Sequence, residues 1–269
     1  MKELLFSGSC LILFFLYLLG EKIHLASKIK KIPLRICITG TRGKSTVTRL
    51  IAGILRENGR KVLAKTTGSR PVMIFPDGSE KEILRWGQPS ILEGKDVLKA
   101  ADQIGVQALV VEMMGIRPEM MRVETVKMFR PHILVITNVR LDHQEQMGTS
   151  KADIAASFAS AIPKKCTVFV QEKKFIQTFE EKANRVKSKI IRAPEAINQK
   201  RVDKGNLETF YERDVHLSLL VAEYLDIDRH VALSGIKKSQ GDTGSLKAWM
   251  SKTGTLPNAC CFISAFAAN

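Results

Sequence analysis

The sequence predicts an α/β protein in which a central domain with a mostly parallel sheet follows one N-terminal transmembrane helix. Short runs of aliphatic and β-branched residues alternate with segments of helical periodicity, which is typical of a parallel sheet covered by helices. A glycine-containing loop joins the first such run, Leu34–Thr39, to a helical pattern. An apolar run over residues 4–20 predicts the transmembrane helix.

The loop after Leu34–Thr39 has the composition of a phosphate-binding loop. Glycines allow backbone N–H groups to turn toward phosphate oxygens, and the N-terminus of the next helix adds partial positive charge. Lys44 is expected to reach the terminal phosphates of a nucleotide, and Ser45 to offer a hydroxyl to Mg²⁺. A surface turn is the alternative, which the flanking strand and helix disfavour. The residues expected to bind the phosphates are Gly40, Thr41, Arg42, Gly43, Lys44, Ser45 and Thr46.

Composition narrows the classes of partner. The 269 residues leave room for one or two domains, and the net charge of +15 favours acidic partners such as nucleotides, acidic substrates or an anionic membrane face. Nucleic acid is not expected, because only 6% of residues are aromatic and none interleave with the basic runs. Five cysteines without metal-type spacing indicate a reducing compartment.

The N-terminal apolar run predicts a single-pass anchor in the cell membrane. Positive charge is concentrated behind the run, beginning with Lys22, which keeps the C-terminal side in the cytoplasm. The sequence behind the run also lacks a good signal-peptidase site, so the anchor is expected to remain uncleaved. Residues 1–21 form the expected anchor and 22–33 a basic juxtamembrane linker.

Three later strands are expected to end at the same edge of the sheet as the glycine loop. The strand over 61–65 runs into Thr66, Thr67 and Gly68, and a hairpin over 72–84 follows it. After a helix over 93–103, the strand over 107–111 ends at Glu112, where a carboxylate suits Mg²⁺. Each of these polar ends could by itself be an ordinary turn or a solvated side chain.

A further strand over 132–137 strengthens the pattern, because it runs into Asn138 and His143. A helix from 118 to about 128 should precede it. Polar side chains at successive strand ends raise the probability of one shared site. The remaining chain predicts a helix starting after Ser150, a strand over 167–171, a basic stretch over 173–204, and helices over 214–225 and 229–237.

These residues resemble the Mur ligase superfamily, whose members are ATP-dependent amide ligases. The short phosphate loop over 40–46, the strand-end Glu112 and the segment from Asn138 to His143 match its motifs. Within the superfamily the chain is most similar to ligase subunits of poly-γ-glutamate (capsule) synthases, which share the N-terminal anchor and the sequences at 42–50 and 65–68. The resemblance covers residues 33–269.

The resemblance implies an enzyme that uses ATP and Mg²⁺ to polymerise glutamate through an acyl phosphate. Lys44 and His143 would be catalytic, Ser45 and Glu112 would hold one Mg²⁺, and His143 would help hold a second. Asn138 would contact the nucleotide. Thr66, Thr67 and Gly68 would line the acceptor side. The implied partners are glutamate, the growing poly-γ-glutamate chain and other membrane subunits of a synthesis and export complex.

The sequence also departs from the family pattern. The helix over 153–162 lacks the lysine that many members carbamylate, and Asp214 and Lys247 stand where an asparagine and an arginine are expected. Residues 34–238 form the expected ATP-binding domain. Residues 239–269 would be a linker, over 239–256, and the first strand of a C-terminal domain that is otherwise missing. The alternatives are another Mur-type ligase for cell-wall precursors or folates, a P-loop ATPase without ligation, and an inactive nucleotide-binding membrane subunit.

Overall fold

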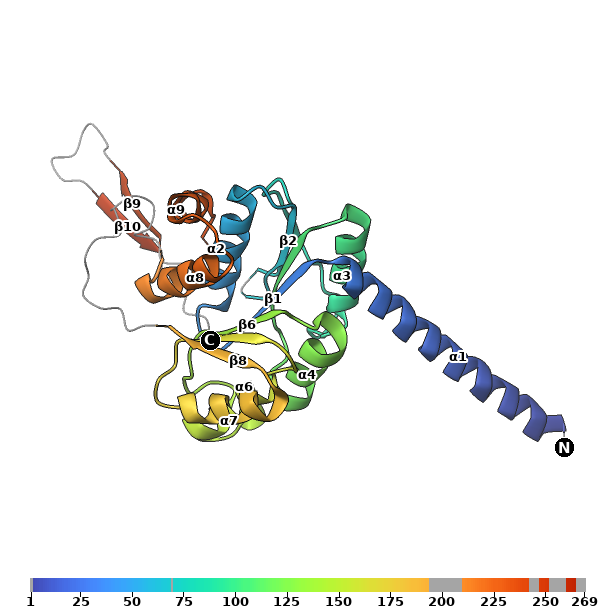
Figure 1. The fold of residues 1–269 in the computed structure, drawn as a ribbon. Helices are drawn as coiled ribbons and strands as arrows, with labels where there is room; N and C mark the ends of the chain where they lie inside the picture. Colours follow the sequence, from blue (N-terminus) through green and yellow to red (C-terminus); the bar gives the residue numbers. More distant parts are fainter. Residues whose placement is uncertain (1, 69, 194–209, 242–246, 252–259, 265–269) are drawn as a thin grey trace.

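The computed structural model describes residues 2–68, 70–193, 210–241, 247–251 and 260–264. Its body is an eight-stranded sheet between two layers of helices, as Figure 1 shows. The strands of this sheet are β1 (Leu34–Thr39), β2 (Val62–Lys65), β3 (Val72–Ile74), β4 (Glu80–Glu82), β5 (Ala108–Glu112), β6 (Ile133–Ile136), β7 (Thr167–Val170) and β8 (Lys189–Arg192).

The sheet has the order β4-β3-β2-β5-β1-β6-β7-β8 and is parallel from β2 to β8. At one edge β3 runs antiparallel to both β2 and β4, and β3 and β4 form the hairpin expected from the sequence. Strand β1 lies between β5 and β6, with β2 to β5 on one side of it and β6 to β8 on the other. Ligands of such sheets bind beyond the carboxyl ends of the strands where the order reverses. The loop after β1 therefore lies at the expected binding edge.

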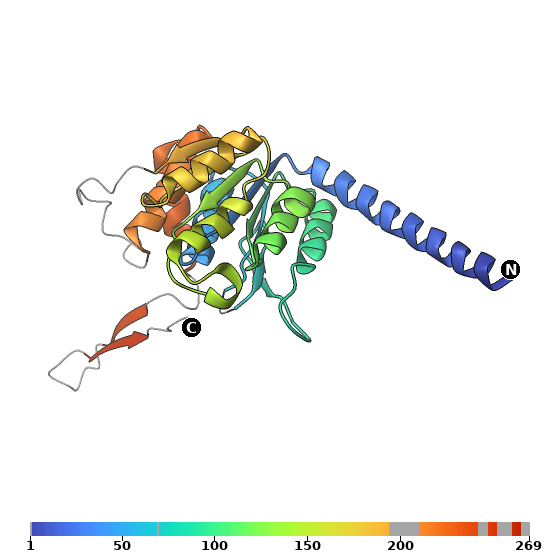
Figure 2. The same cartoon turned by 90° about the horizontal axis from the view of Figure 1, so that it is seen from below.

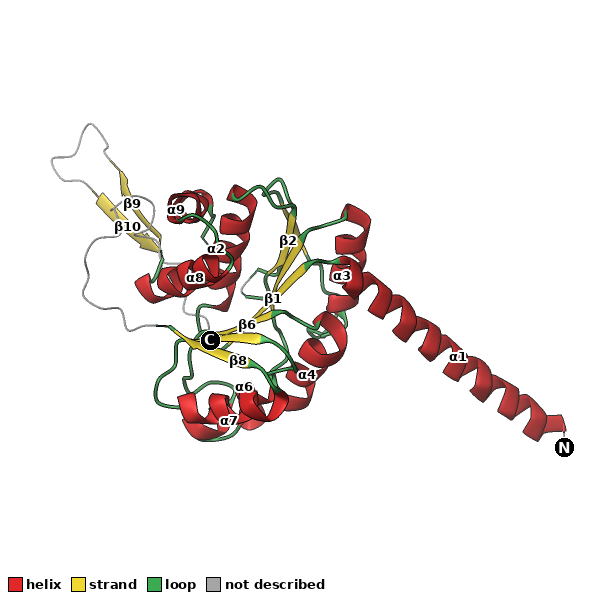
Figure 3. Ribbon diagram, in the orientation of Figure 1, coloured by secondary structure: helices red, strands yellow, loops and turns green. Residues whose placement is uncertain are grey.

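The helices divide between the two faces of the sheet (Figures 1 and 3). Helices α2, α8 and α9 cover one face, and α3, α4, the π-helix η1, α6 and α7 cover the other. Alternate residues of β1 show this division: Ile36 and Ile38 belong to the first core and Cys37 to the second. The helical elements are α1 (Lys2–Lys31), α2 (Lys44–Glu57), α3 (Glu93–Ile104), α4 (Pro118–Arg122), η1 (Val123–Phe129), α5 (Gln144–Met147), α6 (Lys151–Ser160), α7 (Ile176–Val186), α8 (Glu212–Tyr224) and α9 (Arg229–Lys238).

Helix α1 projects from the body and is long and apolar enough to cross a membrane over Phe6–Lys31 (Figure 2). Its last turns reach the domain, where Ile29 is buried in the core. The basic segment expected as a linker over 22–33 is thus mostly helical. The apolar run and the basic segment share helical backbone preferences, and no proline or glycine after Gly20 interrupts them before Pro33.

Two other expectations need correction. The helix from Pro118 to Phe129 has the expected extent, but its second part is the π-helix η1. The segment expected as a linker over 239–256 contains strand β9 (Lys247–Ser251), which pairs antiparallel with β10 (Cys260–Ser264). Glycines around β9 obscured the strand in the sequence. The basic loop expected around 194–204 lies outside the described residues.

Candidate active site

The loop between β1 and α2 requires glycine at two positions. Gly40 has φ 125° and Gly43 has φ 83°, a region that favours glycine. Space is also limiting, because a Cβ on Gly40 would lie 2.2 Å from the Thr137 hydroxyl oxygen. Helix α2 begins at Lys44, so the loop ends at a helix N-terminus, where backbone N–H groups favour anions.

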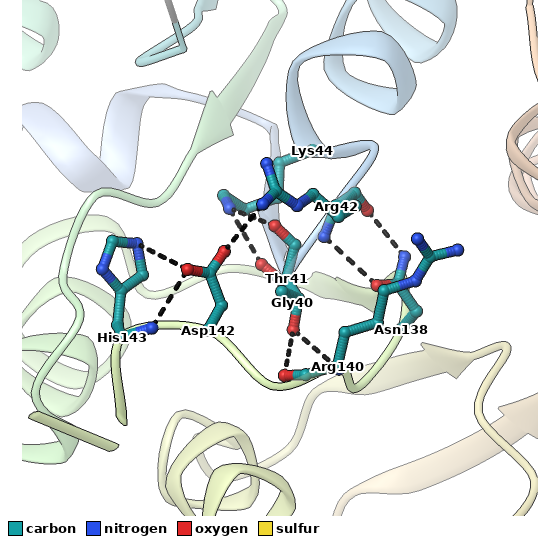
Figure 4. Close-up of polar contacts among 8 residues, drawn as sticks. All are labelled: Gly40, Thr41, Arg42, Lys44, Asn138, Arg140, Asp142 and His143. Carbon is teal, nitrogen blue, oxygen red and sulfur yellow. Dashed lines mark hydrogen bonds and ion pairs between the residues drawn. The ribbon is translucent and has the colours of Figure 1, made fainter. Parts of the chain in front are cut away.

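Residues that directly follow β6 form hydrogen bonds to the backbone of this loop (Figure 4). The Arg42 amide donates to the side-chain oxygen of Asn138 at 3.2 Å, and the Asn138 amide nitrogen donates to the Arg42 carbonyl at 2.7 Å. Thr137 donates to the same carbonyl at 2.7 Å. Asn138 is only 5% exposed. Its amide therefore positions the phosphate loop, and the expected contact with the nucleotide stays a prediction.

Lys44 lies across the loop that it follows. Its ammonium donates to the carbonyls of Gly40 at 2.9 Å and Thr41 at 3.1 Å. Desolvation lowers the pKa of Lys44, while the carboxylates of Glu112 and Asp142 oppose the shift. The ammonium is thus held over the glycine loop by two carbonyl hydrogen bonds.

Ser45 and Glu112 meet, as expected for two ligands of one ion. The Ser45 hydroxyl donates to a Glu112 carboxylate oxygen at 2.7 Å, and the Thr67 backbone amide donates to the same oxygen at 2.8 Å. Glu112 is 2% exposed and ends β5, next to β1. Hydroxyl and carboxylate oxygens are the donors that Mg²⁺ prefers. This pair of side chains fits a magnesium ion.

A cavity of ≈ 510 Å³ opens in front of the phosphate loop. Lys44, Glu112 and His143 all line it, so the ends of three neighbouring strands do converge. His143 directly precedes α5 and has φ 47°, and its ring lies 3.9 Å from Asp142, which also contacts Arg42 at 3.5 Å. Within the described residues no group of three His, Cys, Asp or Glu side chains is gathered as for a metal. The role of His143 with a second ion stays a prediction.

The predicted acceptor side is only partly at the cavity. Thr67 and Gly68 line it, whereas Thr66 is fully buried and its hydroxyl has no hydrogen-bond partner in the described structure. Thr66 directly follows β2, and its backbone amide still donates to the Val72 carbonyl at 3.0 Å, so this residue stays within the sheet.

The part of the cavity wall that contains Arg85 is held in place by an ion-pair network that was not predicted from the sequence. Lys65, at the end of β2, is 1% exposed and lies 3.1 Å from the Glu93 carboxylate. Arg85 donates to both oxygens of Glu93, at 2.7 and 3.1 Å, and itself lines the cavity. A buried lysine requires such a partner. A lysine ending an otherwise apolar strand was the one signal available in the sequence.

Glu124 supports the same wall. It is 1% exposed, and its carboxylate accepts hydrogen bonds from the backbone amides of Met114 and Gly115, at 3.2 and 2.8 Å. Burial raises the pKa of Glu124 to about 7. Glu124 lies in η1, and π-helical turns are frequent at functional sites. Helix propensity alone does not predict the π-helical turn that places this carboxylate next to the backbone amides of Met114 and Gly115.

Asp214 approaches the phosphate loop from the other side. It lies in the first turn of α8 and is fully buried, and a Cβ on Gly43 would lie 2.7 Å from its carboxylate. Its oxygens have no hydrogen-bond partner in the described structure, although Arg213 lies 3.6 Å away. Desolvation raises the pKa of Asp214 to about 6, against the attraction of Arg213 and Arg140.

Asp214→Asn is expected to raise the free energy of unfolding at pH 8 by about 1 to 2 kcal/mol, because the folded protein no longer buries a carboxylate whose desolvation outweighs the attraction of Arg213 and Arg140. The folded state binds this proton more tightly than the unfolded chain, so the stabilising contribution of the protonated group is complete near pH 4 and is lost as pH rises through 6. Chemical denaturation of both proteins at pH 5 and pH 8 measures the effect. Asp226→Asn, at an exposed position after α8, is the control. An equal effect at both pH values would contradict this origin.

The fold and the cavity define an α/β protein with a glycine loop and a helix N-terminus at the binding edge of its sheet. The Mur ligase middle domain model matches residues 38–237, so the chain belongs to the Mur ligase family, as the resemblance predicted. Curated relatives support this. The chain is 31% identical over 265 residues to the capsule biosynthesis protein CapB of Bacillus anthracis, and 33% identical over 264 residues to the PGA synthase CapB of Bacillus subtilis (strain 168).

Both alignments cover 97% of this chain but only 56% and 66% of the two relatives, respectively. The chain therefore spans between half and two thirds of their length. Among solved structures, E. coli FolC in complex with DHPP and ADP has a TM-score of 0.61 at 15% identity, over 83% of this chain and 61% of FolC. That likeness confirms the mostly parallel α/β fold.

Proposed function

We propose that this chain is the ATP-binding part of a membrane-anchored amide ligase that adds glutamate to poly-γ-glutamate, the polymer of a capsule. The convergence of Lys44, Glu112 and His143 on one cavity supports the proposal most directly. The two CapB relatives, one named for capsule biosynthesis and the other a PGA synthase, supply the substrate class.

In the proposed reaction, the γ-phosphoryl group of ATP passes to a carboxylate of the growing chain and gives an acyl phosphate and ADP. The amine of glutamate then attacks the acyl carbon, an amide bond forms, and phosphate leaves. Lys44 would neutralise charge on the transferred group, and backbone amides of residues 40–46 would hold the phosphates. FolC, of the same fold, is known with ADP bound.

The proposed Mg²⁺ would be held by Ser45 and Glu112, whose oxygens already lie together. The ion would supply charge neutralisation at the phosphates. His143 would act near the reacting groups and help to hold a second ion. Thr67 and Gly68 would lie on the acceptor side, and Arg85 would offer positive charge to a carboxylate there, where it lines the cavity.

The proposed location is the cell membrane, with α1 as a single-pass anchor and the domain in the cytoplasm. The exposed apolar surface of α1 favours a lipid environment over water. We assign residues 1–21 to the anchor, 22–33 to the juxtamembrane segment, 34–238 to the ATP-binding domain and 239–269 to a following segment. Other membrane subunits would export the polymer.

The membrane-embedded protein is expected to release phosphate from Mg²⁺/ATP at least about 10-fold faster when glutamate and a poly-γ-glutamate primer are both present, because the primer carboxylate forms the acyl phosphate and the glutamate amine displaces phosphate from it. A coupled phosphate assay measures the rate, and mass spectrometry of the primer detects the added residue. Aspartate in place of glutamate is the control. Phosphate release that ignores glutamate and leaves the primer unchanged would indicate an ATPase without ligation.

A further inference from the structure

The segment between β4 and α3, residues 83–92, exposes an unusual set of apolar side chains. Trp86 is 100% exposed, Leu84 76% and Leu92 56%. Single exposed apolar residues are ordinary, but a tryptophan with no covered surface is not, because a large aromatic ring gains most from burial. Figure 2 shows the segment, in teal, extending from the edge of the body. We call residues 83–92 the interface loop.

The base of the interface loop is fixed to the domain. Arg85 is the only charged residue of the loop, and its guanidinium is bound by both oxygens of Glu93, at the start of α3. Glu93 is in turn held by the buried Lys65. Lys65 and Arg85 share the single carboxylate of Glu93, so one net positive charge stays at the base of the loop, and the rest of the loop presents only apolar and uncharged polar groups.

The packing of α3 against α1 fixes the position of the interface loop along the axis of α1. Lys95, near the start of α3, pairs with Glu21, and Asp102, near its end, accepts a hydrogen bond from Lys31 at 2.8 Å. The two helices therefore run in the same direction, side by side. The start of α3, and with it the end of the interface loop, lies level with Glu21.

Glu21 also marks the end of the apolar part of α1. Residues 11–20 are all exposed, and the large apolar ones include Phe14, Phe15 and Tyr17. At about 1.5 Å per residue, the apolar run over 4–20 measures roughly 26 Å, close to the hydrocarbon thickness of a bilayer. If α1 crosses a bilayer, Glu21 lies at its surface. The basic side chains that follow, such as Lys22 and Lys30, are exposed and suit anionic headgroups.

We propose that the interface loop seats Trp86 and Leu84 in the headgroup region of the bilayer leaflet that α1 enters. Tryptophan is enriched at this depth because its ring is apolar and its N–H can still bond to water or headgroups. The occupant of the exposed apolar surface is thus lipid. Because Arg85 and Pro89 line the cavity, the mouth of the proposed active site would open beside the membrane surface.

This inference rests on the proposed membrane insertion of α1 and is independent of the ligase reaction. The chain contains two tryptophans, Trp86 and Trp249, so Trp249→Phe leaves Trp86 as the only one. The variant is placed in nanodiscs of phosphatidylcholine and phosphatidylglycerol whose acyl chains carry bromine at shallow or deep positions. Emission of Trp86 is expected to fall about two-fold with shallow bromine and much less with deep bromine, as an interfacial ring requires.

A tryptophan placed in α1 distinguishes failure of the interface loop to reach the bilayer from failure of α1 to insert into it. In a second variant, Tyr17→Trp is combined with Trp86→Phe and Trp249→Phe, and bromine within the acyl chains is expected to quench it. Quenching of the α1 reporter without quenching of Trp86 would overturn the inference while leaving the anchor intact, whether the ring then faces water or is covered by protein. If neither reporter is quenched, α1 is not in the bilayer, and the inference falls with the proposed anchor.

Discussion

Lys44→Ala is expected to lower the rate of ADP formation by about 10²- to 10³-fold, the usual cost of removing one preorganised charge from the transferring group. The loss corresponds to about 3 to 4 kcal/mol in the activation barrier. The fold should persist, because the Lys44 ammonium makes only two hydrogen bonds, both to loop carbonyls, and carries no ion pair within 4 Å in the described structure.

The measurement is the glutamate-dependent rate of ADP release by the membrane-embedded variant and wild type. Binding of a fluorescent ATP analogue separates affinity from chemistry. Lys61→Ala, at an exposed position beside β2, is the matched control for loss of one positive charge. Wild-type activity in the Lys44 variant would show that residues 40–46 are not the phosphate site.

Glu112→Gln is expected to lower the affinity of the nucleotide-bound protein for Mg²⁺ by at least about 10-fold. The reason is that a neutral amide is a much poorer ligand for a hard cation than a carboxylate. Glutamine keeps the size of the side chain and one oxygen to accept from Ser45 or Thr67. The change therefore removes charge more than structure. Activity should fall with metal affinity, and high Mg²⁺ should restore part of it.

Thermal unfolding with ATP, at a series of Mg²⁺ concentrations and with EDTA, measures this effect without relying on turnover. Glu124→Gln is the matched control, since it removes another buried carboxyl group, one that accepts from the backbone amides of Met114 and Gly115 and not from Ser45. An unchanged Mg²⁺ dependence in the Glu112 variant would exclude Glu112 as a ligand. Equal losses in the two variants would indicate a general effect on the cavity.

Local patterns in the sequence determined most of the elements. The alternation of apolar runs and helical periodicity predicted β1, α2, β5 and β6 and a mostly parallel sheet, whereas the order of its strands came from the structure. Ser150 with Asp153 predicted the start of α6, and the structure contains the reciprocal capping box there. These features depend on residues within a few positions of one another, so the sequence alone contains the information.

Motif residues at strand ends also predicted much of the site, because parallel strands bring their carboxyl ends to one edge. That geometry placed Lys44, Glu112 and His143 at one cavity. It could not say which neighbours face inward, so Thr66 was included although it is buried. Nor could it separate a residue that binds a ligand from one that holds the loop, as the Asn138 amide does.

The tertiary structure alone decided the contacts between residues far apart in the chain. The pairing of Lys65 with Glu93, and the approach of Asp214 to Gly43, join segments whose spacing in the sequence has no fixed relation to distance. The same holds for the level of the interface loop, which depends on where α3 packs along α1. Sequence periodicity reports which face of an element is buried, whereas the packing of whole elements fixes which side chains meet.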